Sequence, residues 1–263
     1  MAERFAVITG ASSGIGRELA HQFTRHRFDV LICADDGEIY EAARAIAEPG
    51  TEVIPVQVDL RTPDGVESLY RRIKETGRQV DALAVNAGVG QGGRFVESQL
   101  DDALSIVRLN VESSVHLTWL VLREMVARNQ GRILVTSSIA SMMPGSYQAV
   151  YNASKSFLQS FAEALQAELS DSDVTVTSLM PGPTETRFFQ RADMAHNTRV
   201  GRSSKDDPTQ VAAQGFAALM AGKRRVVGGG VATHAQYVAS TFLPDRMKAA
   251  LHSLMAKPLK RAG

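Results

Sequence analysis

Residues 5–16 read Phe-Ala-Val-Ile-Thr-Gly-Ala-Ser-Ser-Gly-Ile-Gly, an apolar run that ends in the three glycines Gly10, Gly14 and Gly16. The residues that follow, 17–23, repeat apolar side chains at helical spacing. This order predicts a strand, a tight turn and a helix. Such a turn lets the backbone approach a pyrophosphate closely and directs the positive end of the helix at it. The stretch therefore indicates a dinucleotide-binding unit.

The same glycines also fit a second motif. Residues 10–14 match Gly-x-Ser-x-Gly, the nucleophile elbow of serine hydrolases, with Ser12 as the nucleophile. That site needs oxyanion donors from an earlier strand-to-helix loop, and only nine residues precede Gly10. Three histidines could complete such a site, and none has a recognisable setting: His196, His234 and His252. We therefore favour the dinucleotide site, although its Gly-x-x-x-Gly-x-Gly spacing departs from the commoner Gly-x-Gly-x-x-Gly.

Apolar runs of strand length alternate with helical patterns along the chain, which predicts an α/β fold. We expect a doubly wound parallel sheet of about seven strands with helices on both faces. The predicted strands are 5–9, 29–34, 53–58, 82–86, 131–137, 174–180 and 225–228. Helices near 100–128 and 151–170 are predicted from apolar stripes at Leu104, Val107, Val111 and Val115 and at Phe157, Leu158, Phe161, Leu165 and Leu169. With no internal repeat or linker, residues 1–263 are interpreted as one domain.

Composition narrows the classes of function. The 263 residues are 44% hydrophobic and 22% charged, with a net charge of +1, which gives no electrostatic case for a nucleic-acid partner. The single cysteine, Cys33, lies in an apolar run and is expected to be a buried structural thiol. The six histidines form no His-x-x-x-His spacing, so no metal site is predicted.

Sequence features near the two ends of the chain indicate where in the cell the protein is expected. The start, Met-Ala-Glu-Arg, lacks the apolar core of a signal peptide, and no apolar stretch is long enough to span a bilayer, so we expect a cytoplasmic protein. A C-terminal helical segment is expected at about 231–257. Its amphipathic stripe and basic end could lie on a membrane, although packing on its own domain or a sister subunit is favoured: Met247, Leu251, Leu254, Met255, Lys257, Lys260 and Arg261.

Tyr151 and Lys155 form a candidate acid/base pair. On a helix, a spacing of four places the phenol and the ammonium on one face, where the cation can favour the phenolate. Bringing a tyrosine pKa from about 10 to near neutrality requires roughly 4 kcal/mol of charge stabilisation, which a nearby lysine can supply.

An ordered set of motifs joins the glycine turn to this pair: Thr9 to Gly16, Asn86-Ala-Gly88, Asn110, Ser138, Tyr151, Lys155 and Pro181-Gly-Pro-Thr184. The set resembles that of the classical short-chain dehydrogenases/reductases and extends from about residue 5 to residue 186. The resemblance implies a Rossmann fold and an oxidoreductase that transfers hydride between nicotinamide and a secondary alcohol or ketone. A non-catalytic dinucleotide-sensing module that acts through a partner protein is the alternative.

The resemblance also implies catalytic roles. Tyr151 donates or takes the substrate proton, and Lys155 lowers its pKa and holds the nicotinamide ribose. Ser138 hydrogen-bonds the carbonyl oxygen, and Asn110 holds a water that relays protons. Ser137 is an alternative to Ser138, but strand alternation points the two serines to opposite faces, so one of them alone can face the site.

Candidate cofactor-binding residues follow predicted strands and so share the carboxyl edge of the sheet. They are Gly10, Ser12, Ser13, Gly14, Ile15, Gly16, Asp35, Asp59, Leu60, Asn86, Ala87, Gly88, Tyr151, Lys155, Pro181, Gly182, Thr184 and Thr186. Asp35 lies nineteen residues after Gly16, near the position of the acid that accepts both ribose hydroxyls. Because its carboxylate would repel the extra phosphate of NADP, with Asp36 adding a second charge and Arg17 a weak counterweight, NAD is the favoured cofactor.

The polar segment 187–207 lacks helical or strand rhythm and is interpreted as a substrate lid. The substrate pocket is predicted to include Met142, Met143, Tyr147 and Phe188, with Pro144, Phe189 and Met194 as further candidates. These side chains favour a substrate that is apolar or aromatic near its carbonyl. The apolar stripes of helices 100–128 and 151–170, together with the family resemblance, predict a homodimer or homotetramer.

Overall fold

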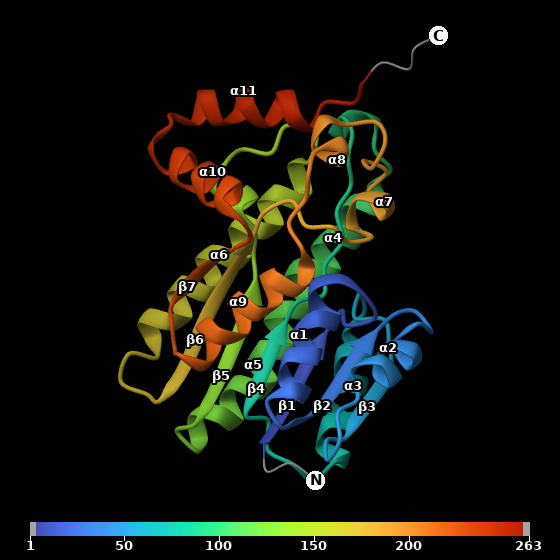
Figure 1. Cartoon of the computed structure of the whole chain (residues 1–263), viewed down its shortest axis with the longest axis vertical. Helices are drawn as coiled ribbons and strands as arrows, with labels where there is room; N and C mark the ends of the chain where they lie inside the picture. Colours follow the sequence, from blue (N-terminus) through green and yellow to red (C-terminus); the bar gives the residue numbers. More distant parts are fainter. Residues whose placement is uncertain (1–3, 260–263) are drawn as a thin grey trace.

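The computed structural model describes residues 4–259, and its centre is one parallel sheet (Figure 1). The strands follow the order β3-β2-β1-β4-β5-β6-β7. Their bounds are β1 Arg4–Thr9, β2 Phe28–Ala34, β3 Val53–Gln57, β4 Ala82–Val85, β5 Gly131–Thr136, β6 Val174–Pro181 and β7 Arg225–Gly228. The predicted doubly wound parallel sheet is confirmed, and each expected strand matches an observed strand to within about one residue at either end.

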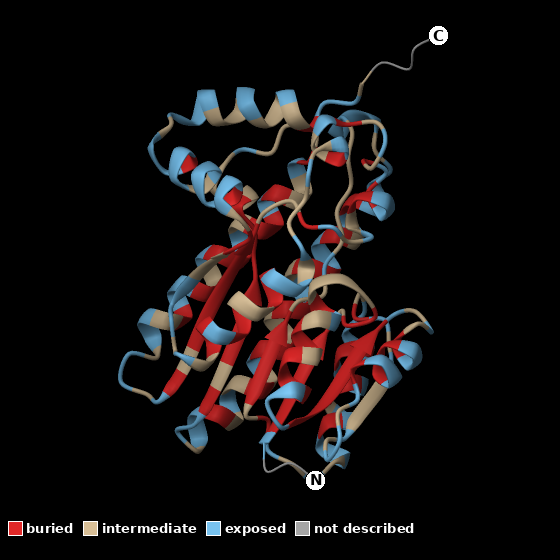
Figure 2. Ribbon diagram, viewed as in Figure 1, coloured by how far each residue is buried: buried red, intermediate tan, exposed pale blue. Residues whose placement is uncertain are grey.

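Helices cover both faces of this sheet. One face packs against α1 (Gly14–Arg25), α2 (Ile39–Ile46) and α9 (Pro208–Met220), and the other against α3 (Pro63–Glu75), α5 (Ser113–Ala127) and α6 (Ala149–Glu168). Successive side chains of β1 alternate between these two cores: Phe5 and Val7 enter one, and Ala6 and Ile8 the other. The central strands are therefore buried on both sides, as Figure 2 shows.

The predicted helix near 100–128 is interrupted. A π-helical turn, η2 (Val107–Glu112), separates α4 (Leu100–Ile106) from α5. The expected apolar stripe is wrong at its start, because Leu104 is 37% and Val107 41% exposed. A π turn inserts an extra residue into the helical ladder, which shifts every side chain before it relative to those after it. Asn110, inside this turn, is fully buried.

The strand order places the ligand site. β1 lies between β2 and β4, so the direction in which the chain adds strands reverses at β1. Ligands of open α/β sheets bind beyond the carboxyl ends of the strands at this switch point. The glycine turn follows β1, and Asn86 follows β4, so the two predicted loops meet there.

The region beyond the carboxyl ends of the strands is built from short elements. The predicted lid contains two helical turns, α7 (Phe188–Arg191) and α8 (Arg199–Arg202), and α10 (Val231–Phe242) and α11 (Asp245–Ala256) lie above the sheet beside it (Figure 1). The η1 turn (Phe95–Glu97) and the η3 turn (Ile139–Met142) complete the helical elements among the residues described.

The C-terminal segment is helical, as expected, but its apolar stripe is poorly buried. Met247, Leu251 and Leu254 are between 52% and 54% exposed. Lys260 and Arg261 of the predicted basic end lie outside the described residues. Within residues 4–259, no helix combines the length and apolar character needed to cross a bilayer. The cytoplasmic location stays a prediction.

Candidate active site

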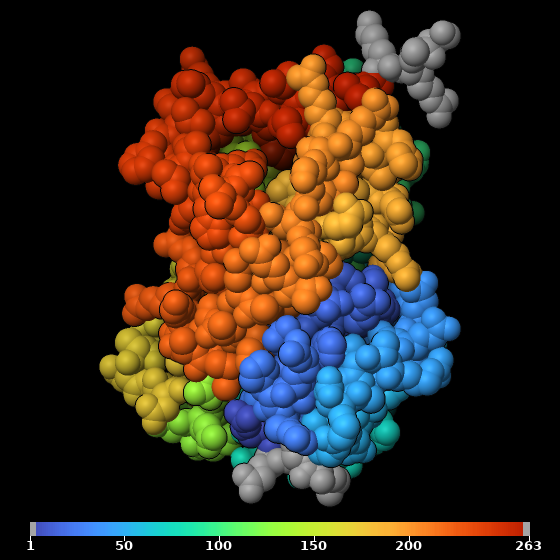
Figure 3. Space-filling view, in the orientation of Figure 1, coloured from blue at the N-terminus to red at the C-terminus, as the bar shows by residue number. Residues whose placement is uncertain are grey.

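A cavity of about 580 Å³ lies at the carboxyl edge of the sheet and extends from the glycine turn to α11. In Figure 3 a hollow opens between the red C-terminal helices and the orange segment beside them. All eighteen predicted cofactor-binding residues line this cavity, from Gly10 to Thr186. The sheet edge therefore gathers residues that are far apart in the sequence into a single site.

The glycine turn is shaped so that backbone, rather than side chains, faces the cavity. Gly10 and Gly14 have φ values of +66° and +57°, a region that favours glycine. A Cβ on Gly10 would lie 2.7 Å from the Cα of Ala87, and one on Gly14 2.7 Å from Cγ2 of Thr186. Ser13 caps α1 without a side-chain hydrogen bond, which leaves the first N–H groups of the helix available to an anion. The turn therefore fits a dinucleotide pyrophosphate.

Asn86 holds this turn against the neighbouring strands. Its Nδ2 donates to the carbonyl oxygens of Thr9 (3.1 Å) and Gly10 (3.3 Å), and its Oδ1 accepts from Oγ1 of Thr136 (3.1 Å). Oγ1 of Thr9 in turn accepts from the N–H groups of Asn86 and Ala87, each at 3.0 Å. Although Asn86 lines the cavity, its amide is occupied by the protein, so its contribution is to fix the shape of the turn.

Ser138 and Tyr151 both line the cavity. Tyr151 lies in the first turn of α6, and Ser138 lies two residues after the end of β5, where its Oγ donates to the carbonyl oxygen of Pro181 at 3.3 Å. The Ser138 side chain is close enough to the phenol to lower its pKa. Oγ of Ser137 points elsewhere and donates to Oε1 of Gln159 at 2.8 Å inside the protein. Of the two candidate serines, Ser138 is thus the one that faces the tyrosine.

Burial, rather than Lys155, dominates the electrostatics of Tyr151 in the protein alone. Burial raises the pKa of Tyr151 to about 12, and the hydrogen bond from Ser138 opposes this rise. Burial also lowers the pKa of Lys155 to about 8. Nζ of Lys155 lies 5.9 Å from the Tyr151 ring centroid and donates to the carbonyl oxygen of Thr136 at 2.9 Å. The predicted lowering of the phenol pKa by Lys155 is therefore not found in the protein by itself.

Asn110 is fully occupied by protein contacts. Its Nδ2 donates to the carbonyl oxygen of Val89 and to Oγ of Ser154, both at 2.9 Å, and its Oδ1 accepts from the N–H of Val89 at 2.9 Å. The π turn that carries Asn110 thus anchors the loop after β4 to α6. The amide positions the Gly88–Val89 backbone, and any role in holding a water stays a prediction.

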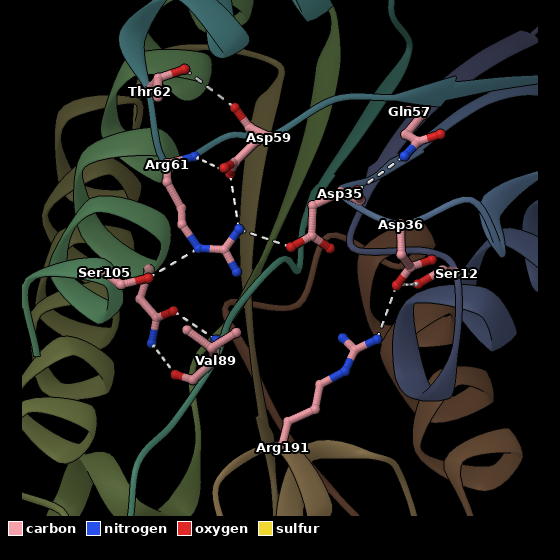
Figure 4. A network of polar contacts seen from close by, with 11 residues as sticks. Ser12, Asp35, Asp36, Gln57, Asp59, Arg61, Thr62, Val89, Ser105 and Arg191 are labelled. Carbon is pink, nitrogen blue, oxygen red and sulfur yellow. Dashed lines mark hydrogen bonds and ion pairs between the residues drawn. The ribbon is translucent and has the colours of Figure 1, made fainter. Parts of the chain in front are cut away.

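An acidic and basic rim surrounds the end of the cavity at β2 and β3 (Figure 4). Nη1 of Arg61 bridges Oδ2 of Asp35 (2.8 Å) and Oδ1 of Asp59 (3.0 Å). On the other side, Oδ2 of Asp36 accepts from Oγ of Ser12 (3.2 Å) and from Nη2 of Arg191 (2.9 Å). Because Ser12 bonds this carboxylate and not a histidine, the geometry gives no support to a serine hydrolase.

Two arginines that line the cavity, Arg61 and Arg191, were not predicted from the sequence. Arg61 follows the predicted Asp59 by two residues, so its place after a strand could have signalled it. Arg191 lies in the lid, 155 positions from its partner Asp36, and no local pattern could have indicated the contact. Asp206 was also missed: its Oδ1 accepts from the N–H of Gly230 at 2.8 Å, which ties the lid to the start of α10.

The far end of the cavity is lined by apolar side chains together with Gln236, Ser240, Lys248 and His252. Met143 and Phe188 line it, whereas Met142 and Tyr147 are not among its lining residues. Of the further candidates, Phe189 lines the cavity, Pro144 does not, and Met194 is fully buried in a small cluster with Phe189, Ala192 and Ala256. The C-terminal segment from α10 to α11, which the sequence did not assign to the pocket, adds Ala239, Leu243, Leu251, His252 and Met255.

His252 connects α11 to α6 and to the loop that precedes it. Its Nδ1 lies 3.0 Å from the carbonyl oxygen of Ser146, and its Nε2 lies 3.3 Å from Nδ2 of Asn152. Burial lowers the pKa of His252, with the hydrogen bond to Ser146 opposing it. Within residues 4–259, no three His, Cys, Asp or Glu side chains are grouped to hold a metal ion.

Comparison with known proteins identifies the family. The family model described as short chain dehydrogenase matches residues 4–197. Human 17-beta-hydroxysteroid dehydrogenase type 1 is 32% identical over 251 residues, covering 85% of this chain and 76% of that protein. A short chain dehydrogenase/reductase from Burkholderia phymatum, solved in complex with NAD, has a TM-score of 0.81 and 27% identity, covering 91% of this chain and 92% of that one. A short-chain dehydrogenase from Sphingobium yanoikuyae, solved with NADPH, has a TM-score of 0.80 and 25% identity over 99% of this chain and 98% of that one. The chain therefore belongs to the short-chain dehydrogenase/reductase family, as its motif set predicted.

Proposed function

We propose that the protein is an NAD(H)-dependent oxidoreductase that acts on a bulky, apolar secondary alcohol or ketone. The observation that carries this proposal is that Ser138 and Tyr151 line the same cavity as the glycine turn and the apolar side chains of Met143 and Phe188. The matched family and relatives are oxidoreductases, which gives no support to the alternative of a non-catalytic sensing module.

In the proposed reaction, the hydrogen on the alcohol carbon leaves as a hydride and the hydrogen on the alcohol oxygen leaves as a proton. When bound, the nicotinamide cofactor accepts a hydride from the alcohol carbon, or gives one to the carbonyl carbon. Ser138 orients the substrate oxygen, and Tyr151 takes the proton from that oxygen or returns it. Lys155, within the same buried site, supplies the positive charge that a Tyr151 phenolate would need. The glycine turn and the N-terminus of α1 bind the pyrophosphate.

NAD is the proposed cofactor because Asp35 directly follows β2, at the position of the ribose-binding acid. One structural neighbour binds NAD and another NADPH, so the choice depends on the rim of this chain itself. Two carboxylates, Asp35 and Asp59, line the cavity at that rim, and Asp36 lies next to them against Ser12. Carboxylates at this place disfavour a phosphate on the adenosine ribose.

The substrate is proposed to be large and apolar. The apolar side chains that line the cavity include Met143, Phe188 and Phe189 and, from the C-terminal segment, Ala239, Leu243 and Met255. One relative that matches most of the chain is named as a hydroxysteroid dehydrogenase. A fused-ring alcohol or ketone of steroid size is therefore the first class to try.

The test measures nicotinamide absorbance with NAD and a panel of 17β-hydroxysteroids, aryl carbinols and 2-propanol. We expect kcat/KM for the bulky alcohols to exceed that for 2-propanol by about 100-fold or more, because each buried CH₂ contributes about 0.8 kcal/mol. Equal values for small and bulky alcohols would contradict the apolar pocket. Tight NAD binding without turnover of any member would favour the sensing alternative, and absence of NAD binding would exclude the proposal altogether.

We further propose a homodimer or homotetramer. Neighbouring helices expose large apolar side chains, with Trp119 of α5 55% and Phe157 of α6 43% exposed. Light scattering is expected to give two or four times the 28.4 kDa of one chain. Trp119→Glu should shift the mass toward one chain, because a charge would be buried in the interface. Phe242→Glu, on exposed α10, is the matched control and should leave the mass unchanged. A wild-type mass of one chain would contradict this prediction.

A further inference from the structure

Arg61 occupies an unusual place on the rim, because it neutralises the acid on which the cofactor preference rests. Its Nη1 lies 2.8 Å from Oδ2 of Asp35, and among residues 4–259 the other oxygen of Asp35 accepts no hydrogen bond. A ribose hydroxyl bound by Asp35 would therefore lie within about two hydrogen-bond lengths of a guanidinium. A phosphate attached to that hydroxyl would reach the same guanidinium.

The guanidinium of Arg61 is held in place independently of Asp35. On the far side, Nε donates to Oγ of Ser105 at 3.0 Å, and Nη1 also lies 3.0 Å from Oδ1 of Asp59. The backbone N–H of Arg61 donates to the same Asp59 oxygen at 2.9 Å. Figure 4 shows Arg61 stretched between these partners. Loss of the Asp35 carboxylate would leave the arginine in position, with one partner fewer.

Asp36 also pairs with an arginine, Arg191, but unlike Asp35 it has no carboxylate oxygen left for a ligand. Both of its oxygens are engaged: Oδ1 accepts from the N–H of Glu38 at 3.2 Å, and Oδ2 accepts from Ser12 and from Arg191 of the lid. This carboxylate therefore ties the glycine turn to the lid. Changing Asp36 would disturb two elements at once, whereas changing Asp35 would free one guanidinium.

We propose that Arg61 is a built-in phosphate ligand that Asp35 keeps occupied, so that the Asp35–Arg61 pair sets the choice between NAD and NADP. The inference rests on the proposed function as a dinucleotide-dependent enzyme. With Asp35 present, the pair offers one carboxylate oxygen to the ribose and an already neutralised arginine to any phosphate. Without the Asp35 charge, Arg61 gains a free donor for the 2′-phosphate, and no new basic residue has to be introduced.

The test is calorimetric binding of two probes that differ only in the 2′-phosphate, 5′-AMP and adenosine 2′,5′-bisphosphate. The measured quantity is the ratio of their dissociation constants. Asp35→Ala is expected to shift this ratio toward the bisphosphate by about 10–100-fold, the range of a charge-assisted hydrogen bond. Adding Arg61→Gln in the same chain should remove at least about tenfold of that gain. The ratio of kcat/KM for NADP to kcat/KM for NAD should likewise rise in Asp35→Ala and fall again when Arg61→Gln is added.

Arg17→Gln on the Asp35→Ala background is the matched control, because Arg17 pairs with Glu18 and does not line the cavity. This control should retain the gain. The three side chains are partly exposed, and melting temperatures will show that every variant folds. Equal ratios for Asp35→Ala with and without Arg61 would overturn the inference, as would an Asp35→Ala protein that binds 5′-AMP without any gain for the bisphosphate. A wild-type protein that binds neither 5′-AMP nor NAD would overturn the proposed function and this inference with it.

Discussion

Tyr151→Phe is expected to lower kcat by about 10²–10⁴-fold, the usual contribution of a positioned acid or base. Tyr151 lines the cavity together with Ser138, whose side chain opposes the rise of the phenol pKa that burial causes. Its ring packs against Phe188, with the centroids 4.9 Å apart, and phenylalanine would keep this contact. Binding of NAD should therefore change by less than about threefold. Steady-state kinetics with the best alcohol of the panel and calorimetry with NAD give the two numbers.

Tyr147→Phe is the control for this prediction, since Tyr147 lies four residues earlier and does not line the cavity. It should retain kcat within about twofold. Retention of most activity by Tyr151→Phe would exclude the phenol as the group that moves the proton. Equal losses in both variants would instead indicate a structural effect on the loop before α6.

The sequence predicts the parts of this protein that local patterns determine. Each strand is a short apolar run between turn residues, so seven strands could be located to within about one residue, and their carboxyl ends follow from the parallel order. The glycine turn was equally local, because three glycines between a strand and a helix suit few other arrangements. The residues at the carboxyl edge then gather in one cavity because the fold brings them there.

What the sequence could not predict depends on contacts between distant segments. The Arg61–Asp35 pair spans 26 positions, and the Arg191–Asp36 pair spans 155. The π turn at residues 107–112 also displaces the predicted apolar stripe, so that Leu104 is exposed. The sequence did not predict this turn, because one extra residue in a helix leaves no clear mark in the hydrophobic pattern.

The electrostatics of the site differ from the sequence-based expectation for the same reason. The spacing of Tyr151 and Lys155 predicts that they share a helix face, and they do. Spacing does not report burial, and burial opposes the charged form of both groups. The site therefore holds an acid and a base in environments that disfavour their charges. Perturbation of this kind is typical of functional sites, which trade stability for chemistry.

Lys155→Met should be inactive yet more stable than the wild type at pH 7. Burial lowers the pKa of Lys155 from 10.5 to about 8. A shift of that size corresponds to about 3 kcal/mol that the folded protein loses when Lys155 is protonated. The lost hydrogen bond from Nζ to Thr136 offsets about 1 kcal/mol. We therefore expect a net gain of about 2 kcal/mol in the free energy of unfolding, measured with urea in the absence of nucleotide.

The stability difference between Lys155→Met and the wild type should depend on pH. Because the folded pKa lies below the unfolded one, the unfolded chain binds more protons between pH 8 and pH 10.5, and wild-type stability rises with pH over that window. Below pH 8 the full cost is present. The advantage of Lys155→Met should therefore be largest at or below pH 8 and shrink toward pH 10.5. The raised pKa of Tyr151 is shared by both proteins and cancels in the difference.

Lys223→Met, at an exposed lysine, is the control and should alter the free energy of unfolding by less than about 0.5 kcal/mol at every pH. A Lys155→Met protein that is less stable than the wild type at pH 7 would show that the ammonium is favourably placed in the fold. An advantage that stayed constant from pH 7 to pH 10.5 would assign the gain to packing of the methionine. An advantage that fades over this window would mean that the buried ammonium is retained for its chemistry at a cost to the fold.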